Sequence, residues 1–408
     1  MLLTFDQAKQ KILQACTTVK SLEHETVSLN DALDRITAVP IISPINVPRF
    51  DNSAMDGYAV RFADIETSRT LPVSKTVYAG DDIGDLNWAI GSCLRIMTGA
   101  PVPNDADAVV MQEHTQVKGQ HITFLKDIKA GDNIRRIGED IKKDAVTVAK
   151  GQRLSIPTLS TLATLGIHQV CVYKTLNVAI FSTGNELTPI GQPLTDNGAI
   201  YDSNGFTLKQ LLTKLNCQVI DLGIIPDDPN QIKQALMTAS TQADLIITSG
   251  GVSVGDADYT KTALEELGQI NFWKIAMKPG KPFAFGQIGK ALFCGLPGNP
   301  VSTVVTFYQL VQPLISALAG QQTLSADLTF QVKTVTDLKK SVGRIDFQRG
   351  RVEPNDQGVL EVKSTGQQGS HITQSFNKAN CFIILEQERG NVSKGEYVTV
   401  TLFNDLLK

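Results

Sequence analysis

The chain has 408 residues, which is enough for about two to three domains, and its net charge is −3. Hydrophobic residues make up 42%, and glycine and proline number 32 and 17, which argues against disordered, collagen-like and low-complexity proteins. The weak charge excludes a strongly basic nucleic-acid binder, so we expect no nucleic-acid partner. Only 19% of residues are charged, against a usual value of ~25%, which indicates that a partner covers part of the surface.

The N-terminal residues show no basic stretch followed by an apolar one, and no unbroken apolar run approaches the ~18 residues that span a bilayer. We therefore expect a cytoplasmic protein with no membrane partner. The six cysteines are scattered singly, without a Cys-x-x-Cys pair. This pattern is typical of reduced, buried thiols rather than of disulfides or zinc ligands.

The first third of the chain changes character twice. The stretch from Thr4 to Gln7 has the pattern of a capping box, and the apolar residues after it predict an amphipathic helix over 5–20. Over 41–150, short apolar runs alternate with Gly, Asp and Asn turns, which predicts a mostly β module. Helical character returns over 155–166.

From residue 177 the chain alternates between strand and helix patterns. We predict strands at 178–181, 219–225, 244–248 and 291–294. Helices follow them, two of which begin with an N-cap residue and a proline, Asp228-Pro229 and Asn299-Pro300. The alternation predicts a parallel sheet with helices on both faces. After residue 326, four short strands predict a small barrel, at 328–335, 345–352, 381–385 and 397–402.

The predicted fold is thus an α/β multidomain protein. Its Rossmann-like parallel-sheet domain covers 177–326 and its C-terminal β-barrel domain covers 327–408. The mostly β module covers 51–139. A helical and extended N-terminal domain, which links the other parts, covers 1–50 and is continued by 140–176.

Four loops follow the four predicted parallel strands. In an open parallel sheet, ligands bind beyond the carboxyl ends of the strands. Every one of these loops is rich in glycine, small hydroxyls or carboxylates, at 182–186, 226–228, 249–258 and 295–299. Four such loops at one edge predict a pocket.

The loop 249–258 carries three glycines. They let backbone N–H groups converge on an anion, or they simply form a turn that lets strand and helix pack, and the residues alone favour neither reading. Gly251 to Gly255 matches the G-x-S-x-G nucleophile elbow of hydrolases, with Ser253 at its centre. The predicted strand and helix lie too far from Ser253 for an elbow. Neither a P-loop nor a G-x-G-x-x-G motif after the first strand is present.

Three lysines, Lys274, Lys278 and Lys281, fall within a stretch that has no acid. They are either a clamp for phosphate or another oxyanion, or part of a solvated surface loop. The neighbouring proline residues limit where the lysines can point.

Carboxylates accompany these cations in the sequence. Glu186, Asp227, Asp256 and Asp258 lie in the loops of the same sheet edge, whereas Asp228 is explained as a helix N-cap. Carboxylates beside an anion site suggest Mg²⁺, which binds one or two acids together with substrate phosphate. Capping or a surface salt bridge explains each acid equally well when it is taken alone.

Nine stretches together resemble the molybdopterin molybdenumtransferase family, which includes bacterial MoeA and the E domain of animal gephyrin. The similarity runs nearly from end to end. The stretches are DNSAMDGYAV (51–60), MTGAPVP (97–103), RRIGEDI (135–141), FSTGNEL (181–187), TSGGVSVGDADYTK (248–261), KPGKPFAFG (278–286), GLPGNPVS (295–302), DFQRG (346–350) and GSH (369–371).

The resemblance implies a late step of molybdenum cofactor synthesis. The enzyme is expected to bind adenylylated molybdopterin and molybdate, to cleave the adenylyl pyrophosphate with Mg²⁺, and to release AMP and the molybdenum cofactor. It further implies a MogA-like Rossmann domain, a homodimer, a molybdopterin adenylyltransferase as upstream partner, and molybdoenzymes or cofactor carriers downstream. Because gephyrin shows that the fold can also host protein-binding roles, a binding or scaffold module remains the alternative.

The resemblance also implies functional residues at matching positions. The implied catalytic residues are Asp56, Asp140, Glu186, Asp227 and Asp258, with the last three as metal ligands. The implied substrate-binding residues are Thr98, Lys274, Lys278, Arg349 and Ser370. The loops add Ser249, Gly250, Gly251, Lys281 and Pro297 to the substrate-binding set. One position departs from the family, because residue 185 is Asn where relatives often carry Asp.

Overall fold

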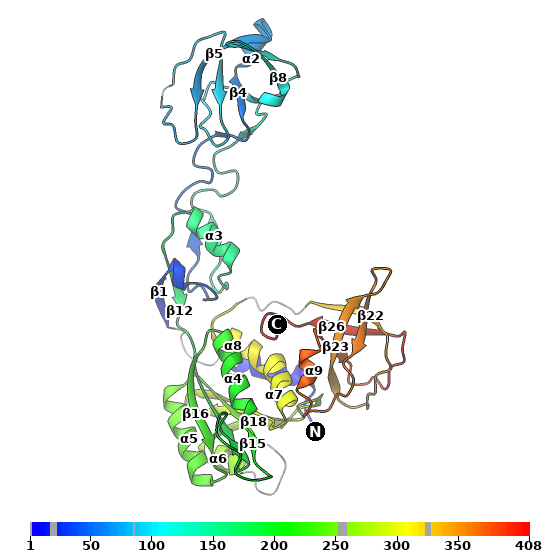
Figure 1. Cartoon of the computed structure of the whole chain (residues 1–408). Coiled ribbons are helices and arrows are strands. Elements are labelled where there is room, and N and C mark those ends of the chain that lie inside the picture. Colours follow the sequence, from blue (N-terminus) through cyan, green and yellow to red (C-terminus); the bar gives the residue numbers. More distant parts are fainter. Residues whose placement is uncertain (1, 17–22, 85, 252–258, 323–327) are drawn as a thin grey trace. The chain divides into compact units, whose positions relative to one another are not determined.

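The computed structural model describes residues 2–16, 23–84, 86–251, 259–322 and 328–408 (Figure 1). The chain forms two compact units. The large unit consists of residues 1–38, 151–155 and 171–408, and the small unit consists of residues 39–150 and 156–170. The division into four domains predicted from the sequence is finer and stays a prediction.

The centre of the large unit is a six-stranded sheet with the order β16-β13-β17-β21-β20-β18. The four parallel strands are β13 (Asn177–Thr183), β16 (Gln218–Ile225), β17 (Leu245–Ser249) and β21 (Ala291–Leu296), as predicted. Two antiparallel strands extend the sheet, β20 (Pro282–Ile288) and β18 (Gly268–Lys274). Neither of these two strands was predicted, because prolines, glycines and lysines obscure the buried apolar run of β20 in the sequence.

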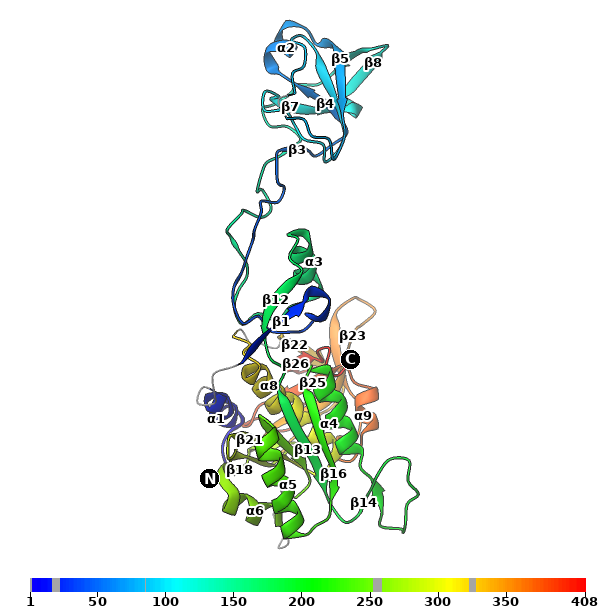
Figure 2. The same ribbon diagram turned by 90° about the vertical axis from the view of Figure 1, so that its left-hand side faces the viewer.

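Helices cover both faces of this sheet, which confirms the prediction. In β13, Val178 and Ile180 belong to one core cluster while Ala179 and Phe181 belong to another, as the alternation of a strand requires. The first cluster includes apolar residues of α4 (Ser203–Lys214), and the second those of α5 (Pro229–Gln242) and α6 (Tyr259–Leu267). Figure 2 shows α4 and α5 on opposite sides of β13 and β16.

A long helical run, Pro300–Leu318, crosses the first core cluster. It consists of α7 (Pro300–Thr306), the π-helical turn η3 (Phe307–Val311) and α8 (Gln312–Leu318). By length and composition this run could cross a membrane, a feature that the sequence analysis missed, but 72% of the window is buried inside the protein. A buried core helix passes the same test, so the run is weak evidence for a membrane span.

The N-terminal helix α1 (Phe5–Cys16) packs in the same cluster, against α8. The predicted capping box is confirmed, since Thr4 N donates to Gln7 Oε1 at 3.0 Å and Gln7 N donates to Thr4 Oγ1 at 3.2 Å. The predicted extension of this helix to residue 20 lies outside the described residues after Cys16.

The C-terminal part of the large unit is the predicted barrel. Its five strands close in the order β23-β24-β22-β26-β25, with β25 returning to pair with β23. They are β22 (Thr329–Thr334), β23 (Ile345–Pro354), β24 (Leu360–Ser364), β25 (Cys381–Leu385) and β26 (Tyr397–Leu402). The sequence analysis missed β24, which is short and mostly polar, and the one-turn helix α9 (Gln374–Asn377).

The small unit is mostly β, as predicted (Figure 2). Its main sheet has the order β7-β4-β6-β5-β9-β8, with apolar clusters on both faces. The strands are β4 (Gly57–Val60), β5 (Thr70–Val77), β6 (Cys93–Ile96), β7 (Ala108–Met111), β8 (Thr115–Lys118) and β9 (His121–Phe124). The helices are α2 (Phe62–Thr67) and α3 (Ile156–Thr164).

Short strand pairs complete the fold. In the small unit, β2 (Ile41–Ile42) pairs with β11 (Val146–Val148), and β3 (Asn52–Ser53) pairs with β10 (Ile134–Arg135). The strands β1 (His24–Ser28) and β12 (Gln169–Tyr173) also pair.

Candidate functional site

A cavity of about 700 Å³ opens beyond the carboxyl ends of the parallel strands in the large unit. All four predicted loops contribute to it. The predicted site residues that line it are Glu186, Asp227, Ser249, Gly250, Gly251 and Pro297. The structure therefore brings these residues together as expected, while their individual roles stay predictions.

Further lining residues were missed by the sequence analysis. They come from β14 (Leu187–Thr188), β15 (Ile200–Tyr201), the first turn of α4 and the barrel segment at His371. Asn204 Nδ2 donates to Ser249 Oγ at 2.8 Å and to the Gly298 carbonyl at 2.7 Å. Asn204 thus ties α4 to two of the predicted loops. A signal was available, because Ser203 and Asn204 follow a strand as small polar residues at a helix start.

The helix starts at this edge differ in their caps. The Asp228 side chain accepts from Gln231 N at 2.8 Å, so its predicted capping role is confirmed. Helix α4 is capped by Asp202, whose side chain accepts from Gly205 N at 2.9 Å. Asn299 occupies the predicted N-cap of α7 but its side chain makes no capping hydrogen bond.

The glycines after β17 form a tight turn. Gly250 has a φ of +86°, and a Cβ atom on it would lie 2.6 Å from the Thr183 carbonyl oxygen. Its N–H donates to the Leu296 carbonyl at 3.2 Å, so this group is already used within the protein. Gly250 therefore serves to let the turn pack closely, and its N–H is not available to bind an anion. The rest of the loop, with Ser253, Asp256 and Asp258, lies outside the described residues.

Three hydroxyls at the ends of β13 and β17 are buried without a hydrogen-bond partner in the described part of the chain. The oxygens of Ser182, Thr183 and Thr248 have no hydrogen-bond partner among the described residues. Leaving a buried hydroxyl unsatisfied costs about 1–3 kcal/mol. Thr183 also lines the cavity, so a polar ligand there could supply the missing partner for its hydroxyl.

Three carboxylates line the cavity: Asp202, which caps α4, and the exposed Glu186 and Asp227. Asp227 is held by a reciprocal pair of bonds: Asn185 N donates to Asp227 Oδ2 at 3.3 Å, and Asp227 N donates to Asn185 Oδ1 at 3.1 Å. The residue that departs from the family pattern therefore anchors a predicted metal ligand. An aspartate there would place a second negative charge beside Asp227.

Glu186 and Asp227 are suited to hold a magnesium ion that keeps some of its waters, and not a metal ion bound entirely by protein side chains. In the described part of the chain, no group of three or more His, Cys, Asp or Glu side chains could hold a metal ion. Mg²⁺ commonly keeps several waters and uses one or two carboxylates together with substrate phosphate. Glu186 and Asp227 supply that donor set, and the third predicted ligand, Asp258, is not described.

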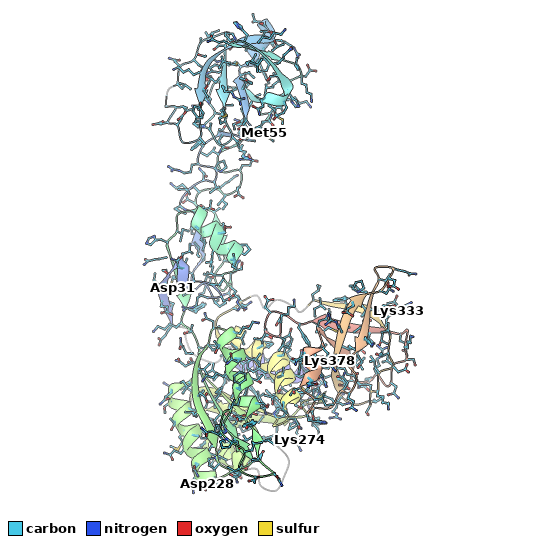
Figure 3. The ribbon with its side chains drawn as sticks, viewed as in Figure 1. Asp31, Met55, Asp228, Lys274, Lys333 and Lys378 are labelled. Carbon is cyan, nitrogen blue, oxygen red and sulfur yellow. The ribbon has the colours of Figure 1, made fainter. Side chains whose placement is uncertain are left out.

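The three predicted lysines are not among the described residues that line the cavity. Lys274, labelled in Figure 3, is the exposed last residue of β18, and Lys281 is exposed in the following loop. Lys278 lies in β19 (Met277–Lys278), and its Nζ is 3.2 Å from Asp346 Oδ2. Asp346, the first residue of the DFQRG stretch, was not predicted as the partner of Lys278.

Arg349 is fully buried behind the segment that reaches the cavity. Its Nε donates to Ser375 Oγ at 3.0 Å and an Nη donates to the Gly369 carbonyl at 3.2 Å. Burial lowers the pKa of Arg349 to about 10, so the guanidinium stays charged at neutral pH. The neighbouring Ser370 carbonyl accepts from Val301 N at the start of α7. Arg349 and Ser370 thus hold the segment whose next residue, His371, lines the cavity.

The remaining predicted residues belong to the small unit. Asp56 Oδ1 accepts from both the N–H and the hydroxyl of Thr98, at 2.7 Å each. These two hydrogen bonds lower the pKa of the exposed Asp56 carboxyl below its ordinary value. Asp140 is exposed, and its backbone N–H donates to the Val47 carbonyl at 3.0 Å.

Profiles of known protein families match most of the chain. Residues 3–166 match the MoeA N-terminal region (domain I and II), and residues 179–317 match a probable molybdopterin binding domain. Residues 331–403 match the MoeA C-terminal region (domain IV).

Relatives extend over the full length. The molybdopterin molybdenumtransferase of Haemophilus influenzae is 54% identical over 407 residues, covering 100% of both chains. Gephyrin of Dictyostelium discoideum is 34% identical, covering 98% of this chain and 62% of its own. A crystal structure of the molybdopterin biosynthesis MoeA protein from Pyrococcus horikoshii OT3 superposes with a TM-score of 0.82 at 28% identity, covering 99% of this chain and 100% of that chain. The resemblance seen in the sequence motifs is confirmed, and the chain belongs to the molybdopterin molybdenumtransferase (MoeA) family.

Proposed function

We propose that the protein inserts molybdenum into adenylylated molybdopterin, cleaving the adenylyl pyrophosphate and releasing AMP and the molybdenum cofactor. The broader part of this statement follows from the family: the protein is a transferase of molybdenum cofactor biosynthesis. The identity of the activated substrate and the course of the reaction are the proposal.

The cavity at the sheet edge is the observation that carries the proposal. Its volume of about 700 Å³ lies in the range of small-molecule sites, which is about 300–1,000 Å³. The cavity combines the Thr183 hydroxyl, which has no hydrogen-bond partner among the described residues, with the Asn204 amide and three carboxylates. A substrate with a pyrophosphate and polar heterocycles offers acceptors and donors to such a lining.

The hydrolytic half-reaction needs acids rather than a protein nucleophile. A water oxygen bonds to one phosphorus of the pyrophosphate, the bridging P–O bond breaks, and AMP departs. Glu186, Asp227 and Asp258 would hold Mg²⁺ and orient the water, and Asn185 keeps Asp227 in place for this task. When bound, Mg²⁺ would neutralise negative charge on the phosphate oxygens.

Molybdate is the second substrate and needs positive groups. Lys274 and Lys278 are the predicted cations for this oxyanion. The two sulfurs of the pterin dithiolene replace oxygen ligands of molybdenum, which leave as water, so the protein need not supply thiolates. Consistent with this, the six cysteines are free thiols, and burial raises the pKa of Cys93 to about 12.

The remaining expectations belong to the same proposal. We propose a cytoplasmic homodimer, supported by a charged fraction of only 19%. A molybdopterin adenylyltransferase would supply the substrate, and molybdoenzymes or cofactor carriers would accept the product.

The test is a defined reaction with purified protein, adenylylated molybdopterin, molybdate and MgCl₂. We expect AMP release together with a product that activates a cofactor-free molybdoenzyme. Reactions without molybdate and without Mg²⁺ serve as controls. AMP release no higher than in a protein-free reaction would contradict the proposal. Tight binding of molybdopterin without turnover would favour the alternative of a binding module.

A further inference from the structure

A carboxylate lies buried behind Lys278. Asp346 is only 2% exposed, and its Oδ2 is 3.2 Å from Lys278 Nζ. The Lys278 side chain is 40% exposed, so its ammonium group joins a buried anion on one side to solvent on the other. A buried carboxylate is costly unless a partner compensates its charge, and Lys278 is the cation with which it forms an ion pair.

We propose that Asp346 is a positioning residue, which holds the Lys278 ammonium at the place where it meets the anionic substrate. The inference rests on the proposed function, because it takes molybdate as the anion that Lys278 contacts. Asp346 itself touches no substrate, since its carboxylate is covered by protein.

The carboxylate is fixed from two directions. Asp346 in β23 pairs in register with Lys278 in β19, so the backbone brings the two side chains together. The buried Gln348 amide donates to Asp346 Oδ2 at 3.2 Å and to the Lys339 carbonyl at 2.9 Å. Because both hydrogens of this amide are engaged, the carboxylate is held in one orientation.

The backbone after Lys278 is also held closely. A Cβ atom on Gly280 would lie 2.4 Å from Thr306 Cγ2, so this turn packs directly on α7. A lysine side chain is long and flexible, and an ion pair with a fixed carboxylate limits the volume its ammonium explores. The pair therefore orders Lys278 before the substrate arrives, which is the usual benefit of preorganisation.

The surroundings of Asp346 are positively charged. Besides Lys278, the charge of Asp346 acts on the buried Lys340 and Arg349. The Lys340 ammonium is bound by three backbone carbonyls, those of Ser341, Gln387 and Arg389. If Asp346 acted only through its negative charge, it would repel an anion, and removing that charge would lower the KM for molybdate. If Asp346 positions Lys278, removing the charge would raise this KM.

The decisive variant is Asp346→Asn, which keeps the side chain's shape and its acceptor for Gln348 but removes the charge. We expect the KM for molybdate in the AMP-release assay to rise about 10-fold, as is typical when a group that orients a ligand is lost, with kcat little changed. The matched control is Asp221→Asn, which breaks an exposed ion pair with Lys209 that has the same 3.2 Å length. We expect no change of KM in this control.

A double-mutant cycle separates positioning from a purely structural role. In a Lys278→Met background, Asp346→Asn should add no further increase of the KM for molybdate, because the group it positions is gone. The Lys278→Met variant alone should unfold at a lower urea concentration than the wild type, since it leaves Asp346 buried and unpaired. The double variant should regain part of that loss.

The outcomes distinguish the inference from the proposed function. A lower KM for molybdate in Asp346→Asn, or an increase that persists in the Lys278→Met background, would overturn the positioning role. An unchanged KM in Lys278→Met would remove Lys278 from the anion site and overturn it as well. A wild-type protein that releases no AMP, and binds no molybdate in equilibrium dialysis, contradicts the proposed function instead.

Discussion

Two regions of the molecule hold their polar groups in contrasting ways: the Asp56–Thr98 pair of the small unit, and the ends of β13 and β17 in the large unit. In the small unit, the exposed Asp56 carboxylate is engaged by the N–H and the hydroxyl of Thr98. In the large unit, the hydroxyls of Ser182, Thr183 and Thr248 are buried without any partner among the described residues. The first arrangement is complete without a ligand, while the second is not. The contrast indicates that the ends of β13 and β17 hold hydroxyl groups that a bound ligand could engage.

Buried polar groups without partners lower the free energy of unfolding. A ligand that bonds to the hydroxyls at the ends of β13 and β17 could offset this loss. Saturated surface groups such as Asp56 have no such cost, and their function depends on being held in one orientation. The predictions below test this difference.

The largest effect is expected for the acids of the cavity. Asp227→Asn should lower AMP release by at least about 100-fold, because it removes a charged group that orients the reacting water or the metal. The matched control is Asp228→Asn one residue later, since asparagine also caps helices well and should preserve both activity and stability. Equal losses in the two variants would show that the loop fold, and not the Asp227 charge, determines the rate.

The turn after β17 should be the next most sensitive feature. Gly250→Ala forces a left-handed backbone on alanine and a Cβ atom to 2.6 Å from the Thr183 carbonyl oxygen. We expect the free energy of unfolding in urea to fall by about 2–3 kcal/mol. Gly191→Ala at φ +91°, with nothing within 4 Å of the Cβ position, is the control and should lose less. Similar losses would mean that backbone strain alone matters at Gly250.

A smaller effect is expected for the buried hydroxyls of Thr183 and Thr248, whose removal should increase stability. Thr183→Val should raise the free energy of unfolding by about 1 kcal/mol, because it removes a buried hydroxyl that has no hydrogen-bond partner among the described residues. It should also raise the KM for adenylylated molybdopterin several-fold, because Thr183 lines the cavity. Thr248→Val, which is not at the cavity lining, should show the stability gain alone. A loss of stability in both variants would contradict the absence of partners.

The smallest effect concerns Asp56, whose pKa is lowered by the hydrogen bonds from Thr98. A depressed folded-state pKa stabilises the protein above the ordinary value of 3.8, and this contribution is lost as the pH falls through the folded-state pKa. Thr98→Val should bring the Asp56 pKa back toward 3.8 in an NMR titration, only in part because the Thr98 N–H remains. An unchanged pKa would assign the shift to the remaining Thr98 N–H and to Arg95 rather than to the Thr98 hydroxyl.

The sequence predicted those parts of the fold that carry a local signal. The caps at Thr4 and Asp228 are examples, because a side chain three residues from its partner leaves a readable spacing. The polar loops after the parallel strands were predictable for a similar reason, since the rule about strand ends needs only the strand order. The edge strands β18 and β20 were missed, because their glycines and prolines read as a loop and their pairing is decided by the sheet.

Contacts between distant segments were beyond the sequence patterns. Asn204 reaches the loops after β17 and β21, some 45 and 94 residues away in sequence. Lys278 pairs with Asp346 because two strands meet in register, which no spacing rule reveals. Motif resemblance pointed to Lys278 and Arg349, but only the structure shows what surrounds them.

The position of α1 has a consequence for how the protein is made. Phe5, Ala8 and Ile12 pack in the core cluster of the large unit, and the Phe5 ring meets that of Phe347 at 5.2 Å. The ribosome completes Phe347 only after more than 300 further residues, which takes roughly 15–60 s at about 5–20 residues per second. Until then the apolar face of α1 lacks part of the core cluster that buries it. The nascent chain therefore presents an early binding site for chaperones, and deletion of the first helix would leave an apolar groove on the finished protein.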